Sequence, residues 1–302
     1  MFHVEQTEFS STFQCLLCDN KQFTKHLTVK DHFLSGETFE LICCSHCGLI
    51  STTPGLKEED LWKYYKSENY ISHSSKAGTT FEKIYQAVRN YTISKKVKLI
   101  SRYSRGKNIL DIGCATGEFL NACRQHGFSV EGIEPNENAR QIALQNHNLS
   151  IHGLEMIKSL SDNSFDVITL WHVLEHVPDL NERMKQISRL LKPDGTVFLA
   201  LPNHESFDAK HYREFWAAYD VPRHIFHFNK KSLAYLANKF NFEVSDILPM
   251  KFDSFYVSLL SEKYKTGKSS VVSAVYFGLL SNFKARGIQP NHSSLIYVLK
   301  KK

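Results

Sequence analysis

The sequence of 302 residues lacks two features that would assign it to a membrane or to export. No apolar run approaches the ~20 residues that a membrane-spanning helix needs. The N-terminal residues 1–6 contain no basic segment followed by an apolar one, so no secretory signal is expected. Both absences predict a cytoplasmic protein without a transmembrane segment.

An excess of charge of one sign is also missing. Lys and Arg together number 37 against 31 Asp and Glu, which gives a net charge of +6, and the only basic run is residues 300–302. A solvated surface accounts for this balance better than a nucleic-acid interface does. Hydrophobic residues make up 42% of the chain, enough for a full core. We therefore expect one main domain with smaller additions.

Cysteines are few, but five of the seven lie before residue 50. In a cytoplasmic protein this favours metal ligation over disulfides. Two residues between paired cysteines let both sulfurs of one turn reach a single tetrahedral zinc ion. Two such pairs occur, and they predict a structural zinc site with four protein ligands: Cys15, Cys18, Cys44 and Cys47.

Alternatives to this ligand set remain at the sequence level. The gap of 25 residues between the pairs is longer than the roughly 15 to 20 that are typical. Cys43 and His46 are spare ligands, and either could replace Cys44. Burial of unligated cysteines is the other interpretation.

Residues 56–104 are expected to form a helical connection. Aromatic and aliphatic residues recur there at helical spacing and predict an amphipathic helix: Phe81, Ile84, Tyr85, Val88 and Tyr91. Other aromatic residues precede this helix: Tyr64, Tyr65, Tyr70 and His73. We expect these to pack against the protein, with a lid over a bound ligand as the alternative.

From residue 108 onward, strand and helix signals alternate, as in a mostly parallel α/β sheet with flanking helices. The expected strands are 108–112, 128–133, 165–170, 196–201, 242–248 and 294–299, with a weaker one at 149–152. The predicted organisation has three parts: a zinc-ribbon-like module at 1–54, a helical connector or lid at 55–104, and a Rossmann-like domain at 105–302.

The last part contains a predicted helical insertion near 251–291. Residues 271–283 form a nearly continuous apolar run that is too short to span a bilayer. We expect a buried or substrate-covering helix, with contact to a membrane surface as the alternative.

In open parallel sheets a ligand binds beyond the carboxyl ends of the strands. The first strand leads into a turn whose small residues alternate at Gly113, Ala115 and Gly117. Glu134 follows the second strand, 23 positions after Asp111, and a carboxylate there can accept hydrogen bonds from both hydroxyls of a ribose. The G-x-G-x-x-G spacing of a dinucleotide-binding turn is absent, which disfavours a nicotinamide-dependent oxidoreductase.

The stretch Asp111–Gly117 resembles the first motif of class I S-adenosylmethionine-dependent methyltransferases. The resemblance covers about residues 105–245, with the family's motifs in order. Its further parts are Glu134, 164–168, 171–177 and 191–195. Ala115 is a departure, since many members have glycine there, but a methyl group is small enough to leave cofactor binding intact.

Carried over by position, the resemblance implies a binding site for S-adenosylmethionine. Asp111, Gly113 and Gly117 would surround the methionine part together with Ala115, and Glu134 would hold the ribose.

The adenine and the transferred methyl group are implied to have their own neighbours. Glu155 and Asp162 would lie near the adenine, in a region that varies within the family. Trp171 and His172 would face the methyl group.

A competing motif overlaps this region. His172, Glu175 and His176 fit the H-x-x-E-H signature of inverted zinc peptidases, which needs a sustained helix. The expected strand ends at Leu170 and Pro178 follows closely, so we expect no such helix and no peptidase.

The segment after the fifth strand is rich in groups that bind polar acceptors or move protons: Asn203, His204, His211, Tyr212, Trp216, Asp220, Arg223, His224 and His227. If the acceptor is a hydroxyl or a carbon, a base must remove a proton, and His172, His204 and His224 are the candidates. Residues 219–224 and the cysteine-bearing N-terminus also resemble methyltransferases of glycan and natural-product pathways.

The sequence therefore predicts an S-adenosylmethionine-dependent methyltransferase that acts on a small molecule or a sugar-containing precursor. One alternative is an RNA methyltransferase that holds nucleic acid with its zinc module and basic surface. The other is a non-catalytic zinc-ribbon binding protein.

Overall fold

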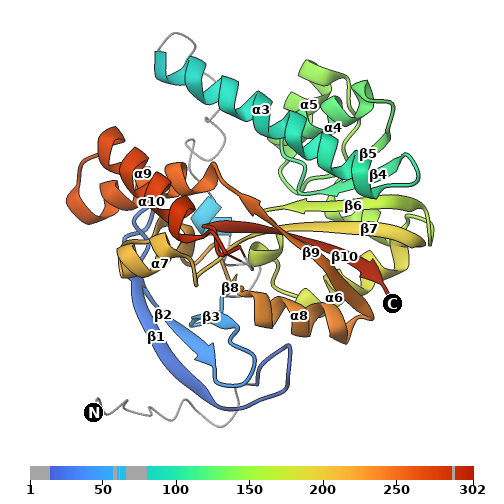
Figure 1. Ribbon diagram of the computed structural model, residues 1–302. Helices are drawn as coiled ribbons and strands as arrows, with labels where there is room; N and C mark the ends of the chain where they lie inside the picture. The colour runs from blue at the N-terminus through green and yellow to red at the C-terminus, as the bar shows by residue number, and fades with distance from the viewer. Residues whose placement is uncertain (1–13, 57–59, 61, 66–79, 288–289) are drawn as a thin grey trace. The chain divides into compact units, whose positions relative to one another are not determined.

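The computed structural model describes residues 14–56, 60, 62–65, 80–287 and 290–302 (Figure 1). The chain forms two compact units. Unit 1 comprises Met1–Ser67, Leu174–Asn181 and Leu201–Ile296, and unit 2 comprises Glu68–Val173, Glu182–Ala200 and Tyr297–Lys302. Each unit combines segments that are distant in sequence, so the units differ from the three consecutive parts expected above.

Six strands form one sheet in the order β5-β4-β6-β7-β10-β9. Their bounds are β4 Asn108–Ile112, β5 Ser129–Ile133, β6 Phe165–Trp171, β7 Leu191–Pro202, β9 Phe242–Met250 and β10 Ser294–Lys301. Strands β5, β4, β6 and β7 pair in parallel. The predicted α/β fold with a mostly parallel sheet is confirmed.

The helices of unit 2 precede or connect these parallel strands. They are α3 Thr80–Tyr103, α4 Glu118–Gln125, α5 Glu137–His147, the short η2 Leu154–Lys158, and α6 Leu180–Leu190, whose first two residues belong to unit 1. Asn136 caps α5 by accepting a hydrogen bond from the Ala139 amide. Ile109 and Leu110 of β4 are fully buried, as a central parallel strand requires. The weak strand expected at 149–152 forms only a single bridge, between His152 and Ile133.

Strand β7 begins earlier than expected. A turn at 192–195 is a natural interpretation of the Lys-Pro-Asp-Gly sequence, but these residues lie inside β7. Leu191 pairs with Phe165 of β6 and Thr196 pairs with Val167, so the pairing register shifts between them. The extra residues are accommodated as a bulge, which keeps the strand continuous.

Unit 1 contains a four-stranded sheet in the order β1-β2-β3-β8. Its strands are β1 Phe23–Lys30, β2 Thr38–Cys44, β3 Ile50–Thr53 and β8 Phe226–His227. The pairs are antiparallel. The last strand comes from a segment far along the chain, so the sheet that starts with N-terminal strands is completed by residues 226–227.

The segment 202–229, for which the sequence predicted neither helix nor strand, contains helical structure. It forms α7 Phe207–Tyr212 and the short helices η4 Arg213–Phe215 and η5 Ala217–Tyr219. Ser206 caps α7 by accepting a hydrogen bond from the Ala209 amide. The brevity of these helices explains why no periodic pattern identified them.

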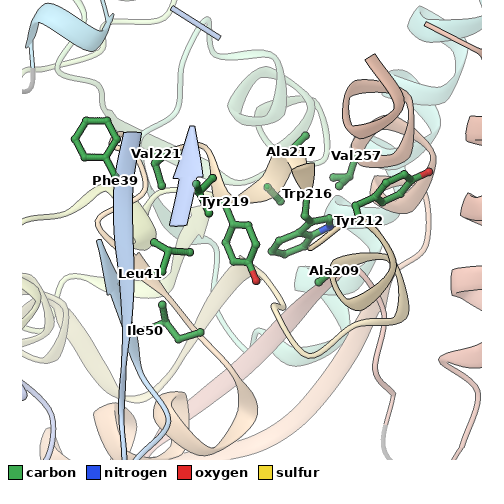
Figure 2. Close-up of a cluster of buried hydrophobic side chains, with 12 residues drawn as sticks. Phe39, Leu41, Ile50, Ala209, Tyr212, Trp216, Ala217, Tyr219, Val221 and Val257 are labelled. Atoms are coloured by element: carbon green, nitrogen blue, oxygen red, sulfur yellow. The ribbon is translucent and has the colours of Figure 1, made fainter. Parts of the chain in front are cut away.

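The core of unit 1 joins the N-terminal sheet to this segment (Figure 2). Phe39 and Leu41 of β2 belong to the same buried cluster as Trp216 and Tyr219. Trp216 is 1% exposed, and its Nε1 donates to Oδ2 of Asp208 at 2.8 Å. Burial of each such large side chain stabilises the fold by roughly 2 to 3 kcal/mol. The cysteine-bearing segment therefore shares its core with later parts of the chain.

Unit 1 also contains α8 Lys230–Lys239, α9 Asp253–Thr266, α10 Val271–Lys284 and the short helices η1 Trp62–Tyr65 and η3 Leu174–His176. Helix α10 confirms the helix expected from the apolar run at 271–283. Its expected burial is wrong for one face, since Val272 and Tyr276 are exposed. Among the described residues, no helix has the length and apolar character needed to cross a membrane.

Candidate active site

The turn after β4 adopts an unusual backbone conformation. Gly113, Ala115 and Gly117 have φ angles of +76°, +48° and +81°. A Cβ atom at Gly113 would lie 2.4 Å from Cγ2 of Val173. Glycine at 113 is therefore required both for the turn and for the close approach of the segment after β6.

This turn is fastened to the end of β5. The amides of Gly113 and Cys114 both donate to the carbonyl oxygen of Ile133, at 2.7 and 3.1 Å. Glu134 is the next residue after Ile133, and its carboxylate closes the connection. Oε2 accepts from the Ala115 amide and Oε1 accepts from the Asn136 amide, both at 2.9 Å.

Glu134 is 9% exposed, and burial raises the pKa of its carboxyl group. Each carboxylate oxygen has two acceptor positions, so the two amides leave capacity for further donors. The structure thus brings Glu134 and the turn together, with a carboxylate that has acceptor positions left at this edge of the sheet.

Asp111 lies inside β4 and is 2% exposed. Its Oδ1 accepts a hydrogen bond from the Thr169 hydroxyl at 2.5 Å. Burial raises the pKa of the Asp111 carboxyl to about 7. A cation bound nearby would favour the ionised form, so this carboxyl suits a positively charged ligand.

Trp171 and His172 occupy the carboxyl end of β6. The Trp171 ring lies edge-on to Phe119, with ring centroids 5.4 Å apart, and Nζ of Lys96 lies 4.2 Å from the Trp171 ring centroid. His172 has a φ of +57°, and its amide donates to the carbonyl oxygen of Ala200 at 3.0 Å. The side chain of the next residue, Val173, packs against Gly113, so the backbone that follows β6 passes beside the turn.

The two acids expected near the adenine differ in position. Glu155 is exposed in η2, and its carboxylate folds back over Gly153. Asp162 precedes β6 and forms an ion pair with Arg189 at 2.6 Å. Residues before a parallel strand lie at the edge opposite to its carboxyl end, so Asp162 is left out of the site proposed below.

Residues of α3 contact the side chains near the turn, and no sequence pattern pointed to them. Lys96 stacks on Trp171, and Arg89 forms an ion pair with Glu118 at 2.6 Å. Both are basic positions on a helix expected only to dock, and no local motif distinguishes them from surface lysines and arginines. Two of the aromatic residues for which a lid is the alternative, Tyr70 and His73, lie outside the described part of the chain.

His204 and His224, the other two base candidates, belong to unit 1. His204 helps to line a cavity of about 690 Å³, and burial lowers its pKa to about 3. His224 is 8% exposed, with its Nδ1 2.9 Å from the carbonyl oxygen of Ala218 and its ring centroid 4.5 Å from that of His176. The contacts of both imidazoles that are described lie within unit 1.

The H-x-x-E-H segment does not form the helix of a zinc peptidase. The helix η3 spans only three residues, Leu174–His176. His176 instead faces the Tyr65 hydroxyl and the Arg223 carbonyl oxygen, 3.1 and 3.0 Å from its Nδ1. The expectation that this segment forms no sustained helix is confirmed.

The four cysteines of the two C-x-x-C pairs converge in unit 1. The sulfurs of Cys15 and Cys47 are 3.5 Å apart, and those of Cys18 and Cys44 are 3.6 Å apart. All four sulfurs lie within 4.8 Å of one another. The spacing far exceeds the ~2.05 Å of a disulfide and approaches the roughly 3.8 Å between sulfurs that a tetrahedral zinc with 2.3 Å bonds requires.

The spare ligands considered from the sequence are engaged elsewhere. Nε2 of His46 is 2.8 Å from the Tyr235 hydroxyl, and the Cys43 thiol contacts the carbonyl oxygen of Cys44. Neither belongs to the cluster of converging ligand atoms. The donor set that fits a metal ion is thus the one with Cys44.

Comparison with known proteins identifies the segment that carries the turn. A family model described as a methyltransferase domain matches residues 85–247, more than half of the chain. The ubiquinone biosynthesis O-methyltransferase of Haemophilus ducreyi is 40% identical over 110 residues, which is 32% of this chain and 46% of that protein. The enzyme of the same name from Pseudomonas aeruginosa is 37% identical over 107 residues, which is 32% of this chain and 45% of that protein.

The chain thus spans less than half the length of these relatives. Among solved structures, a SAM-dependent methyltransferase from Archaeoglobus fulgidus is 21% identical, with a TM-score of 0.49 over 73% of this chain and 98% of that one. From the family match and the residues around the turn, the chain belongs to the methyltransferase-domain family and carries a domain of the class I S-adenosylmethionine-dependent type.

Proposed function

We propose that this methyltransferase transfers the methyl group of S-adenosylmethionine to a hydroxyl oxygen of a small-molecule acceptor. A sugar-containing precursor is one such acceptor. The relatives named above are O-methyltransferases by name, which supports oxygen as the acceptor atom. The observation that carries the proposal is the position of His172 in the backbone that passes beside the Gly113 turn, because hydroxyl acceptors need a base at the reacting atom.

In this proposal the residues at the carboxyl ends of β4 and β5 hold the cofactor. The turn 113–117 lies along its methionine part, Asp111 provides a carboxyl group beneath the turn, and Glu134 accepts hydrogen bonds from the ribose hydroxyls. Bound S-adenosylmethionine supplies the methyl group from a sulfonium that loses its charge in the transfer. The protein's main contribution is alignment, for which effective molarities reach about 10⁵ M or more.

His172 is the base in this proposal. Trp171 and Val173 flank it, and both contact residues of unit 2 that border the turn. His204 is disfavoured because a pKa of about 3 makes it a weak base at neutral pH. His224 is disfavoured because the Ala218 carbonyl and the His176 ring enclose it.

His172→Ala should lower kcat by about 10² to 10⁴-fold while leaving cofactor affinity within twofold, since the imidazole acts on the acceptor proton. Steady-state kinetics and calorimetry with S-adenosylhomocysteine measure the two effects. His126→Ala, an exposed histidine of unit 2, is the matched control and should retain full activity. A His172→Ala enzyme with unchanged kcat would remove His172 from the mechanism.

The four converging cysteines further support a structural zinc ion, which remains part of this proposal. The residues fit zinc because all four donors are sulfurs at tetrahedral spacing, and four protein ligands leave no open position for catalysis. Zinc would join the turn that precedes β1 to the turn that follows β2.

The acceptor class is tested with methyl-labelled S-adenosylmethionine and a cell extract that has been separated into RNA and small molecules. Mass spectrometry should find the label on oxygen in the small-molecule fraction. Label in RNA, with RNA affinity that falls steeply with salt, would support the RNA methyltransferase instead. Cofactor binding without any transfer would support a binding protein.

A further inference from the structure

Helix α10 has two apolar faces, and one of them is exposed. Six of its large side chains are between 45% and 82% exposed: Val271, Val272, Val275, Tyr276, Leu279 and Phe283. Steps of three and four residues place side chains on one side of a helix, so Val272, Tyr276, Leu279 and Phe283 form a stripe along it. A run of this kind on a water-exposed helix indicates an interaction surface.

The opposite face of α10 is held firmly by unit 1. A Cβ atom at Gly278 would lie 2.5 Å from the Phe255 ring of α9, so the two helices are in close contact. The Ser254 hydroxyl of α9 donates to the Gly278 carbonyl, and the Ser281 hydroxyl donates to buried Asp208 at 2.7 Å. The exposed stripe is therefore presented on a fixed helix.

Helix α9 extends the apolar area. Phe252, which precedes the helix, and Tyr256, in its first turn, are 40% and 43% exposed. Nδ2 of Asn282 donates to the carbonyl oxygen of Lys251, which brings the start of α9 beside the end of α10 (Figure 1). We call the exposed stripe of α10 together with Phe252 and Tyr256 the α9–α10 surface.

The charges around this surface have one sign. Every exposed charged side chain between residues 251 and 287 is basic: Lys251, Lys263, Lys265, Lys268, Lys284 and Arg286. The two acids of this segment are less exposed: Asp253 is partly buried and Glu262 is 8% exposed. The balanced charge of the whole chain does not predict such local asymmetry.

We propose that the α9–α10 surface docks on an anionic lipid membrane. Apolar and aromatic side chains enter the interface between headgroups and acyl chains, while lysines and arginines at both ends of the helices bind anionic headgroups. A second copy of the chain fits less well, because self-association would bring the two sets of basic residues together. The binding is peripheral and independent of the acceptor that the enzyme methylates.

Sedimentation with lipid vesicles tests this proposal. The full chain should bind vesicles of phosphatidylcholine and phosphatidylglycerol at least tenfold more tightly than vesicles of phosphatidylcholine alone, and added salt should weaken the binding. The double variant Val272→Ser/Leu279→Ser should lose at least tenfold in binding. Leu144→Ser is the matched control, because Leu144 is a 53% exposed leucine on α5 of unit 2.

A second pair of substitutions separates charge from folding. Lys265→Glu/Lys268→Glu should lower binding to anionic vesicles severalfold and leave the melting temperature unchanged, since both side chains are exposed. Wild-type protein that ignores anionic vesicles would overturn the proposal, as would full binding by the Val272→Ser/Leu279→Ser variant. A dimer that the same variant abolishes would assign the surface to a second copy.

Discussion

Cys44→Ser should yield protein without zinc and with a destabilised unit 1, whereas Cys43→Ser should retain one zinc ion per chain. Cys44 has its sulfur 3.6 Å from that of Cys18, inside the converging cluster. The adjacent Cys43 lies outside the cluster. The two variants thus change neighbouring residues of one strand, and only one of them is a predicted ligand.

The expected loss of stability is about 4 kcal/mol or more, in the range caused by removal of a structural metal. The Phe39, Leu41 and Trp216 core does not depend on the metal, so unit 1 should retain part of its structure. Metal content by mass spectrometry and unfolding in urea measure the two effects. Wild-type protein without zinc, or zinc retained in Cys44→Ser, would refute the assignment.

The second large effect is expected for Glu134→Ala, which should weaken binding of S-adenosylmethionine by about 10 to 100-fold. A hydrogen bond to a charged group contributes about 1.5 to 3 kcal/mol, which corresponds to this range. Loss of the carboxylate also frees the amides of Ala115 and Asn136, so the turn itself loosens. Isothermal calorimetry measures the affinity.

Glu137→Ala, an exposed acid three residues further on, is the matched control and should bind the cofactor normally. Glu134→Gln keeps two acceptor positions on its amide oxygen and should fall between wild type and Glu134→Ala. Unchanged affinity in Glu134→Ala, with a folded protein by circular dichroism, would place the ribose elsewhere.

Much of this site could be predicted from the sequence because its signals are local. The strand 108–112, the turn with Gly113 and Gly117, and the acid at 134 each follow from short-range chemistry. The two C-x-x-C pairs predicted a four-cysteine ligand set with Cys43 and His46 as alternatives to Cys44, and the structure brings the four sulfurs of the two pairs together. In each case the residues that act together lie within one turn or at the ends of adjacent strands.

Features that depend on distant contacts could not be predicted in this way. The stacking of Lys96 on Trp171 joins α3 to the end of β6, and only tertiary packing distinguishes Lys96 from a surface lysine. Strand β8 completes the N-terminal sheet from 170 or more residues away, as the pairing of Ile50 with His227 shows. The exposure of one face of α10 could not be predicted because an apolar run does not reveal which side of a helix is covered.

The most direct test of the account is a crystal structure of the protein with bound S-adenosylhomocysteine. We predict that the ligand lies along the turn 113–117, with both ribose hydroxyls on the Glu134 carboxylate and its sulfur directed toward His172. Ligand bound at another edge of the sheet, or with its ribose away from Glu134, would contradict the central claim.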